Sequence, residues 1–222
     1  MVTTYTSGKN IKMIRILVAD DHPIVRAGLK QLIAEYKDIE ISGEASDGKE
    51  AFEKALKNDY DVILLDITMP GINGLDILKQ LINRKPGIKI LVLTIHPEEQ
   101  YAQRALKAGA SGYLTKESAP QELISAIRKI ASGGKYISPS LAEKLFFLDE
   151  SHITKPAFQL LSDREYQIMC LIAKGVRLNS IAKELFLSVK TVSSYRSRIL
   201  RKLNIKSNAE LVRYALDNQL IQ

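Results

Sequence analysis

The sequence of 222 residues predicts a doubly wound α/β domain with a five-stranded parallel sheet, followed by a small all-α domain of four helices. In the first part of the chain, five short apolar runs alternate with segments whose apolar residues recur at helical spacing. Strict βα alternation favours a parallel sheet covered by helices on both faces, and right-handed crossovers wind it in both directions. In the last third, helical patterns follow one another without a strand between them.

The apolar runs and helical patterns of the first domain alternate in chain order. The predicted strands are Ile14–Ala19, Ile39–Ile41, Val62–Leu65, Ile88–Leu93 and Gly112–Leu114. The predicted helices are Val25–Ala34, Lys49–Leu56, Leu75–Ile82, Tyr101–Ala108 and Ala119–Ala131. The run Val62–Leu65 is apolar at every position, which is typical of a strand that is buried on both faces.

The last third of the chain predicts four helices. The first begins with Ser162 at its N-cap and Glu165 three residues later, which is a capping box. It ends at Lys174-Gly175, and the later helices are predicted at Leu178–Phe186, Val189–Leu203 and Asn208–Asp217. Only the tight turn Leu187-Ser188 separates the second helix from the third, so the pair is typical of a helix-turn-helix.

Four segments follow from these patterns. Residues 1–12 are a polar tail, disordered or leading into the first strand, and residues 13–131 form the α/β domain. Residues 132–160 are a linker with a short helix that starts at Ser138-Pro139-Ser140 and carries Leu141, Leu145 and Leu148 on one stripe. Residues 161–222 form the helical domain.

Charge and cysteine content narrow the class of protein. Residues 158–222 hold 11 Lys and Arg against 5 Asp and Glu, so they carry +6 of the net +7. Such a basic domain beside a near-neutral one is typical of nucleic-acid binding. One cysteine excludes a disulfide framework within the chain, and no apolar run has the length of a membrane span. We therefore expect a cytoplasmic protein.

The predicted strands end in polar residues. Asp20-Asp21 follow the first strand, Asp66 the third, Thr94 the fourth and Thr115-Lys116 the fifth. In a parallel sheet these ends lie at one edge, so three carboxylates converge, and a cation is expected to relieve their repulsion. Oxygen ligands favour Mg²⁺. The sequence has neither a Gly-x-Gly-x-x-Gly motif nor a P-loop, which argues against a nucleotide.

These residues stand in motifs that resemble a known domain. Ile16–Pro23, Leu65–Gly71, Thr94 and Tyr113–Lys116 are similar to the flavodoxin-like receiver domain of bacterial response regulators. The resemblance implies that Asp66 accepts a phosphoryl group from a sensor histidine kinase, with Lys116 and Thr94 assisting. It implies Mg²⁺ held by Asp21, Asp66 and the backbone carbonyl of Thr68, with Asp20 acting through water. Thr94 and Tyr113 would form the switch, Tyr113 turning inward once Thr94 moves toward the phosphoryl group.

One position departs from the usual receiver pattern, and two more lie where side chains affect the acyl phosphate. Many receivers have proline after the lysine, whereas Glu117 follows Lys116 here, so no cis-proline turn is expected. Thr68 and His96 lie two residues after Asp66 and Thr94, where side chains could tune hydrolysis of an acyl phosphate. His96 could position water there, but its place beside Pro97 favours an exposed loop histidine.

The predicted helix Val189–Leu203 has a polar face and a core face, the latter formed by Val189, Val192, Ile199 and Leu203. Its small hydroxyls, flanked by cations, suit a major groove. The last third carries the motifs Leu161-Ser162-x-Arg164-Glu165, Ile181-Ala182-x-x-Leu185, Ser188-Val189-Lys190-Thr191-Val192 and Lys202-Leu203. With these motifs, Leu161–Ile221 resembles the DNA-binding domain of LuxR type, so the whole chain resembles a NarL/FixJ-type two-component response regulator. The DNA contacts expected from this helix are Lys190, Thr191, Ser193, Ser194, Tyr195, Ser197, Arg198 and Lys202. Many relatives carry lysine where Ser193 stands, which leaves the bases read here open.

The expected function is a transcription factor switched by phosphorylation of Asp66, which dimerises when phosphorylated and binds double-stranded promoter DNA. We expect no enzyme beyond self-catalysed phosphorylation and dephosphorylation, and no membrane partner. One further hypothesis is that the unphosphorylated receiver covers Val189–Leu203. The alternatives are a Mg²⁺-dependent phosphatase or kinase-like enzyme using the same acidic pocket, and an interaction regulator that binds DNA constitutively.

Overall fold

The computed structural model describes residues 12–70, 73–96, 98–118, 120–139, 141–143, 157–218 and 220–221. Residues 1–11 of the predicted tail and the stripe residues Leu145 and Leu148 lie outside this range. Residues 139 and 141–143 are helical, and the Leu141 amide donates to Ser138 Oγ at 3.1 Å, so the predicted helix start at Ser138 is confirmed.

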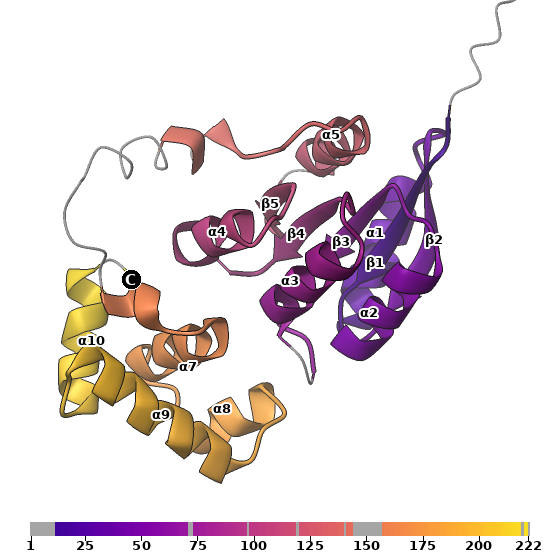
Figure 1. Ribbon diagram of the computed structural model, residues 1–222. Helices are drawn as coiled ribbons and strands as arrows, with labels where there is room; N and C mark the ends of the chain where they lie inside the picture. Colours follow the sequence, from indigo (N-terminus) through magenta and orange to yellow (C-terminus); the bar gives the residue numbers. More distant parts are fainter. Residues whose placement is uncertain are drawn as a thin grey trace, which may run out of the picture.

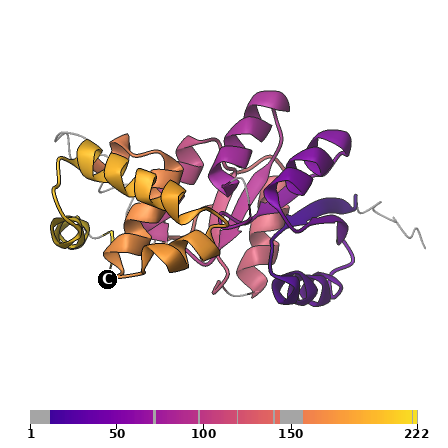
Figure 2. The ribbon, with the colours of Figure 1, turned by 90° about the horizontal axis from the view of Figure 1, so that it is seen from below.

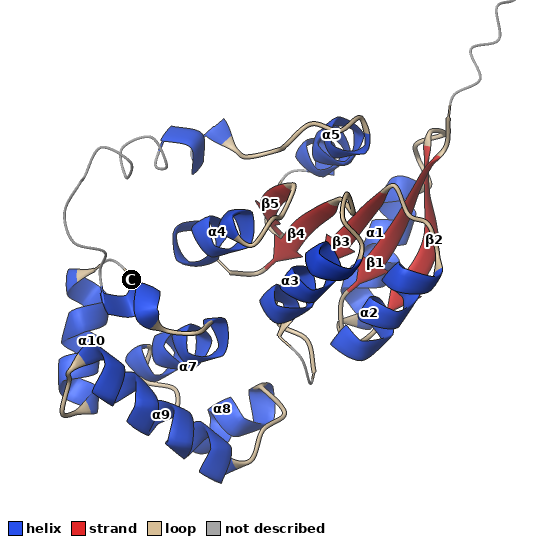
Figure 3. Cartoon of the chain, in the orientation of Figure 1, coloured by secondary structure: helices blue, strands red, loops and turns tan. Residues whose placement is uncertain are grey.

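A five-stranded, all-parallel sheet forms the first domain, as predicted (Figures 1 and 3). Its strands lie in the order β2-β1-β3-β4-β5. Their bounds are β1 (Ile14–Ala19), β2 (Ile39–Ala45), β3 (Val62–Leu65), β4 (Ile90–Thr94) and β5 (Gly112–Thr115). The order reverses direction between β1 and β3, and an open α/β sheet places its ligand crevice at the carboxyl ends of strands at such a point.

Helices cover both faces of the sheet. They are α1 (Pro23–Ile33), α2 (Gly48–Lys57), α3 (Gly74–Arg84), α4 (Glu98–Lys107) and α5 (Pro120–Ala131). Alternate residues of β3 face opposite sides: Ile63 and Leu65 pack with α2, α3 and α4, whereas Val62 and Leu64 pack with α1 and α5. This division explains why β3 is apolar throughout.

Some element bounds differ from the predicted ones. β2 continues to Ala45, beyond the predicted end at Ile41, because its pairing with β1 resumes after a register shift. α4 begins at Glu98 and not at Tyr101. α8 ends at Glu184 and not at Phe186, because Phe186 has a φ of 53°, which no right-handed helix can contain.

The C-terminal domain contains the short 3-10 helix η1 (Ala157–Leu160) and α7 (Asp163–Ala173), α8 (Leu178–Glu184), α9 (Val189–Leu203) and α10 (Asn208–Asp217). The predicted capping box of Ser162 and Glu165 is present. Residues 157–160, which we placed in the linker, pack with this domain: the Phe158 amide donates to Tyr214 Oη at 3.0 Å.

The two domains lie in contact. In Figure 1, α7 lies on the side of the C-terminal domain that faces α3 and α4, with α9 beyond it. Figure 2, seen from below, again places the orange segment of α7 beside the helices of the first domain. A cluster of buried side chains is continuous across this contact, from Leu78 and Tyr101 to Tyr166 and Ile168.

Candidate functional site

The carboxyl ends of β1 and β3 bring the predicted carboxylates together. Asp20, Asp21, Asp66 and His22 each offer a ligand atom, and these atoms all lie within 4.8 Å of one another. Asp20 and Asp66 are buried, with 2% of each residue exposed. The convergence follows from register, because Ala19 pairs with Leu65 and so places the residues that follow both strands at one edge.

Lys116 joins the two buried carboxylates. Its Nζ lies 2.6 Å from Asp20 Oδ2 and 2.6 Å from Asp66 Oδ2. Burial by itself lowers the pKa of the ammonium, but Asp66 and Asp20 outweigh burial and raise it, so Lys116 stays charged. The pKa of the Asp66 carboxyl is raised, because the group is almost entirely out of water. The nearby charge of Lys116 opposes this rise but does not cancel it.

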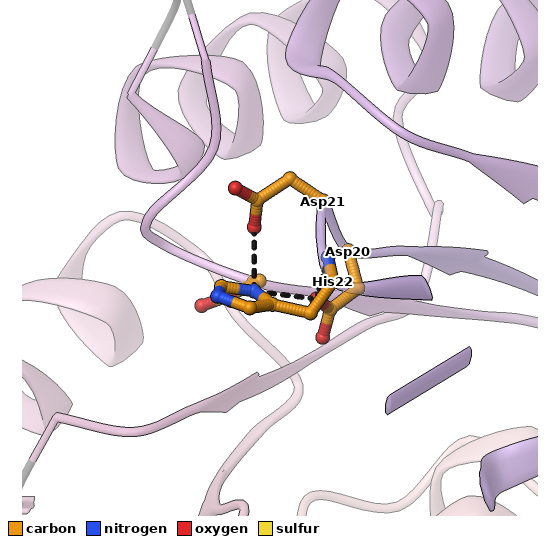
Figure 4. A group of neighbouring side chains, drawn as sticks. Asp20, Asp21 and His22 are labelled. Atoms are coloured by element: carbon orange, nitrogen blue, oxygen red, sulfur yellow. Dashed lines mark hydrogen bonds and ion pairs between the residues drawn. The ribbon is translucent and has the colours of Figure 1, made fainter. Parts of the chain in front are cut away.

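His22 is a pocket residue that we did not predict. Its Nδ1 lies 2.8 Å from Asp21 Oδ1 and 3.3 Å from Asp20 Oδ1, and Figure 4 shows the ring between these two carboxylates. The side chain is 56% exposed. The sequence did offer a signal for placing His22 in the pocket. It directly follows Asp20-Asp21, where the loop that lines the crevice begins.

One buried polar atom of the pocket lacks the hydrogen bond expected of a buried group. Thr94 Oγ1 has no hydrogen-bond partner among the described residues, whereas Asp21 Oδ1 has its 2.8 Å ion-pair contact with His22 Nδ1. Thr94 lies close enough to Asp66 to lower the pKa of its carboxyl, although no well-aligned hydrogen bond forms. Three carboxylates beside an unpartnered hydroxyl fit a hard cation such as Mg²⁺, which binds oxygen ligands. The predicted ligand role of the Thr68 carbonyl stays a prediction.

The expected DNA-contacting side chains share one face of α9. Lys190, Ser193, Ser194, Ser197 and Arg198 are exposed. Val192, Ile199 and Leu203 are buried on the opposite side, as the predicted core face requires. Val189, which we also expected on the core face, is 44% exposed, because it is the first residue of the helix. A hydroxyl-rich surface edged by Lys and Arg is therefore open to solvent along a helix of 15 residues.

The pocket and the helix match two known families. The family described as "Response regulator receiver domain" matches residues 16–128, and the one described as "Bacterial regulatory proteins, luxR family" matches residues 159–215. "Response regulator UvrY" of Escherichia coli K12 is 42% identical over 209 residues, which cover 94% of this chain and 96% of that protein. The chain is a two-component response regulator of the NarL/FixJ type.

Two further proteins are similar to this chain over both of its domains. "Oxygen regulatory protein NreC" of Staphylococcus carnosus is 39% identical to this response regulator, covering 94% of the chain and 99% of that protein. A solved structure of RcsB from Salmonella enterica serovar Typhimurium, bound to promoter rprA in the presence of phosphomimetic BeF3-, is 27% identical, with a TM-score of 0.62. That match covers 90% of this chain and 98% of the RcsB chain. Receiver domains bind Mg²⁺ through an acidic pocket, and the regulator carries such a cluster.

His96 of the response regulator is not the exposed loop residue that we favoured. It is partly buried, and its Nε2 lies 2.7 Å from Thr68 Oγ1. Its ring lies 4.4 Å from that of Tyr101, centroid to centroid. Burial lowers the pKa of His96 to about 4, and the charges of Lys174 and Lys116 add to the effect, so the ring is neutral at pH 7. The prediction was wrong because the ring packs against Thr68 and Tyr101 of the receiver and is not fully exposed to solvent.

Tyr113 already lies in the inward position that we expected only after phosphorylation. It is fully buried, and its hydroxyl donates to the His96 carbonyl at 2.8 Å. Inward rotation is therefore not available as the response to phosphorylation from this conformation.

The docked interface centres on Arg104 and Asp163. The Arg104 guanidinium donates to the carbonyls of Phe158 and Leu161 at 2.7 and 2.9 Å and lies 3.2 Å from Asp163 Oδ1. It also stacks 4.1 Å from the ring centroid of Tyr166. Lys79 Nζ lies 2.5 Å from Asp163 Oδ2, so this buried carboxylate is paired with two cations of the receiver.

The hypothesis that the receiver covers α9 is wrong for this conformation. The receiver contacts η1 and α7, and the exposed polar face of α9 is left open. Three of the residues expected to contact DNA have structural partners. Lys202 Nζ lies 2.6 Å from the buried Glu165, Thr191 Oγ1 lies 2.7 Å from the N-cap Ser188, and Tyr195 packs on the core. Their contacts to DNA stay predictions.

Proposed function

We propose that this response regulator is a cytoplasmic transcription factor that accepts a phosphoryl group on Asp66 from a sensor histidine kinase. Phosphorylation favours a homodimer, which binds promoter DNA through α9. The observation that carries the proposal is the Lys116 ammonium 2.6 Å from both Asp20 and Asp66, beside an unpartnered Thr94 hydroxyl. A carboxylate held in this way is placed to act as a nucleophile rather than only to balance charge.

The transfer forms one bond and breaks one. An oxygen of Asp66 attacks the phosphorus of the phosphohistidine, the P–N bond breaks, and the imidazole nitrogen leaves with the electron pair of that bond. The product on Asp66 is an acyl phosphate. Lys116 neutralises charge on the phosphoryl oxygens during transfer, and Thr94 can donate its free hydroxyl to one of them. Asp20, Asp21 and Asp66 would hold Mg²⁺, which supplies further neutralisation of phosphoryl charge.

DNA recognition by α9 is supported by its open face and by the basic charge of the domain. The RcsB relative has been solved on a promoter with a phosphomimetic present, which supports both halves of the proposal. We infer that no external substrate is turned over. Hydrolysis of a small phosphoester by the regulator would favour the enzyme alternative.

The test measures DNA affinity with and without Mg²⁺ and acetyl phosphate, for the wild type and for Asp66→Ala. The wild type should bind promoter fragments more tightly and sediment as a dimer only when both reagents are present, whereas Asp66→Ala should not respond. Asp59→Ala is the matched control, because Asp59 is an exposed aspartate outside the pocket. A wild type with unchanged DNA affinity and mass would favour constitutive binding and refute the proposal.

No helix among the described residues is long and apolar enough to cross a membrane. Direct localisation in cells would test the cytoplasmic assignment.

A further inference from the structure

Two serines on the open face of α9 have their hydroxyl protons engaged by the helix itself. Ser194 Oγ donates to the Lys190 carbonyl at 3.0 Å, and Ser197 Oγ donates to the Ser193 carbonyl at 3.1 Å. Each bond reaches back four residues, the usual pattern for serine inside a helix. Both side chains remain exposed.

The direction of these bonds is unambiguous. A backbone carbonyl has no proton, so in each pair the serine hydroxyl must be the donor. The hydroxyl has one proton and two lone pairs, so each serine oxygen presents only acceptor sites outward. Donation to the carbonyl also polarises the hydroxyl and makes its oxygen a better acceptor.

This polarity decides what the serines can read in DNA. A free serine is ambiguous because it can donate or accept. The donors in the major groove are the exocyclic amino groups, N6 of adenine and N4 of cytosine, whereas N7, O6 and O4 are acceptors. We propose that Ser194 and Ser197 recognise exocyclic amino groups of their base pairs. The inference rests on the proposed DNA binding by α9 and adds the chemical group that is read.

The number of hydrogen bonds kept or lost gives the size of the preference for an amino group over an acceptor atom. A serine that accepts from an amino group keeps its bond to the helix and gains one. A serine that donates to N7 or O6 loses the helix bond to make the new one. A difference of one hydrogen bond corresponds to about a fivefold change in affinity for each serine.

The same helix supplies contrasts. Lys190 carries only donors and suits the acceptor edges of bases or a phosphate. The Ser193 hydroxyl has no hydrogen bond to the described residues, although it is exposed on the same helix. Its proton is uncommitted, so it can donate or accept. The matched control lies outside α9: Ser132 is exposed, and its hydroxyl likewise donates to a backbone carbonyl, that of Lys129, at 2.7 Å.

The test removes single base atoms within a duplex recovered by selection from a random library, using the full-length regulator with Mg²⁺ and acetyl phosphate. At each pair of a half-site, 2-aminopurine replaces adenine or 2-pyrimidinone replaces cytosine, which removes the major-groove amino group. Separately, 7-deazapurines remove the N7 acceptor. Each duplex is titrated with the wild type, Ser194→Ala, Ser197→Ala and the control Ser132→Ala, and effects on the duplex itself cancel in the comparison between proteins.

The expected result is one pair for each serine at which loss of the amino group weakens the wild type about fivefold more than the corresponding alanine variant. Ser132→Ala should retain the wild-type sensitivity at those pairs, and 7-deaza substitution should affect wild type and variants equally. Greater sensitivity to N7 loss, or no pair coupled to either serine, would overturn the inference while leaving DNA binding in place. Recovery of no bound duplex would instead refute the proposed function.

Discussion

The Arg104→Ala substitution should release the C-terminal domain from the receiver. Arg104 belongs to α4 and bonds to Phe158, Leu161 and Asp163 of the other domain, and it stacks on Tyr166. Its side chain is 16% exposed, so these contacts are partly shielded from water. Alanine removes all of them and leaves two carbonyls without their donor.

The expected loss follows from these contacts. Breaking a buried ion pair by removing one partner costs about 3–5 kcal/mol. Lys79 still pairs with Asp163 in the variant, so we take the lower end of that range. A loss of about 3 kcal/mol lowers the docking equilibrium constant by roughly 150-fold at room temperature.

The assay measures the distance between the domains. Spin labels at Lys49→Cys on α2 and Arg213→Cys on α10 report it, because both positions are exposed. The native Cys170 is 3% exposed, and burial raises its thiol pKa to about 11, so it should resist labelling. The otherwise unaltered protein should give one narrow distance distribution, and Arg104→Ala a broad one.

The control is Lys107→Ala, which removes an exposed cation from the same helix. It should keep the narrow distribution. A narrow distribution for a fully labelled Arg104→Ala variant would show that the contacts of Arg104 do not hold the two domains together.

The remaining predictions concern stability and DNA binding. A Cβ on Gly74 would overlap the Asp66 carbonyl oxygen and lie 2.7 Å from Ile67 Cα, so Gly74→Ala should lose about 3 kcal/mol in urea unfolding. Gly28 lies in α1 with open space around it, so Gly28→Ala should raise the free energy of unfolding by about 1 kcal/mol. Similar unfolding free energies for the two variants would contradict the close packing around Gly74. Because burial raises the folded-state pKa of Asp66, its ionisation opposes folding above the ordinary carboxyl pKa. Asp66→Asn should therefore be more stable than wild type at pH 7 without Mg²⁺, and the advantage should disappear in acid; equal melting temperatures at pH 7 would contradict this. Arg198→Ala should weaken binding to all duplexes and reduce the salt slope by about 1, whereas an unchanged slope would exclude a phosphate contact.

The acidic pocket was predictable because parallel strands share a direction. Once Asp20 and Asp66 were placed directly after apolar runs, the sheet had to bring them to one edge. The helix starts at Ser162 and Ser188 were predictable for a similar reason, because an N-cap depends only on residues within one turn. His22 and His96 were missed as partners because neither belongs to a periodic pattern.

The sequence alone therefore determined the two folds, the carboxylates and lysine of the pocket, and the polar face of α9. The tertiary structure decided that α7 docks on the receiver, that Tyr113 lies inward, and that α9 stays open. Asn73 and Gln167, which hydrogen-bond across the interface, are 94 residues apart, and no local pattern marks them as partners. Periodicity reports which face of an element is buried, whereas a contact between domains depends on the relative orientation of two complete surfaces.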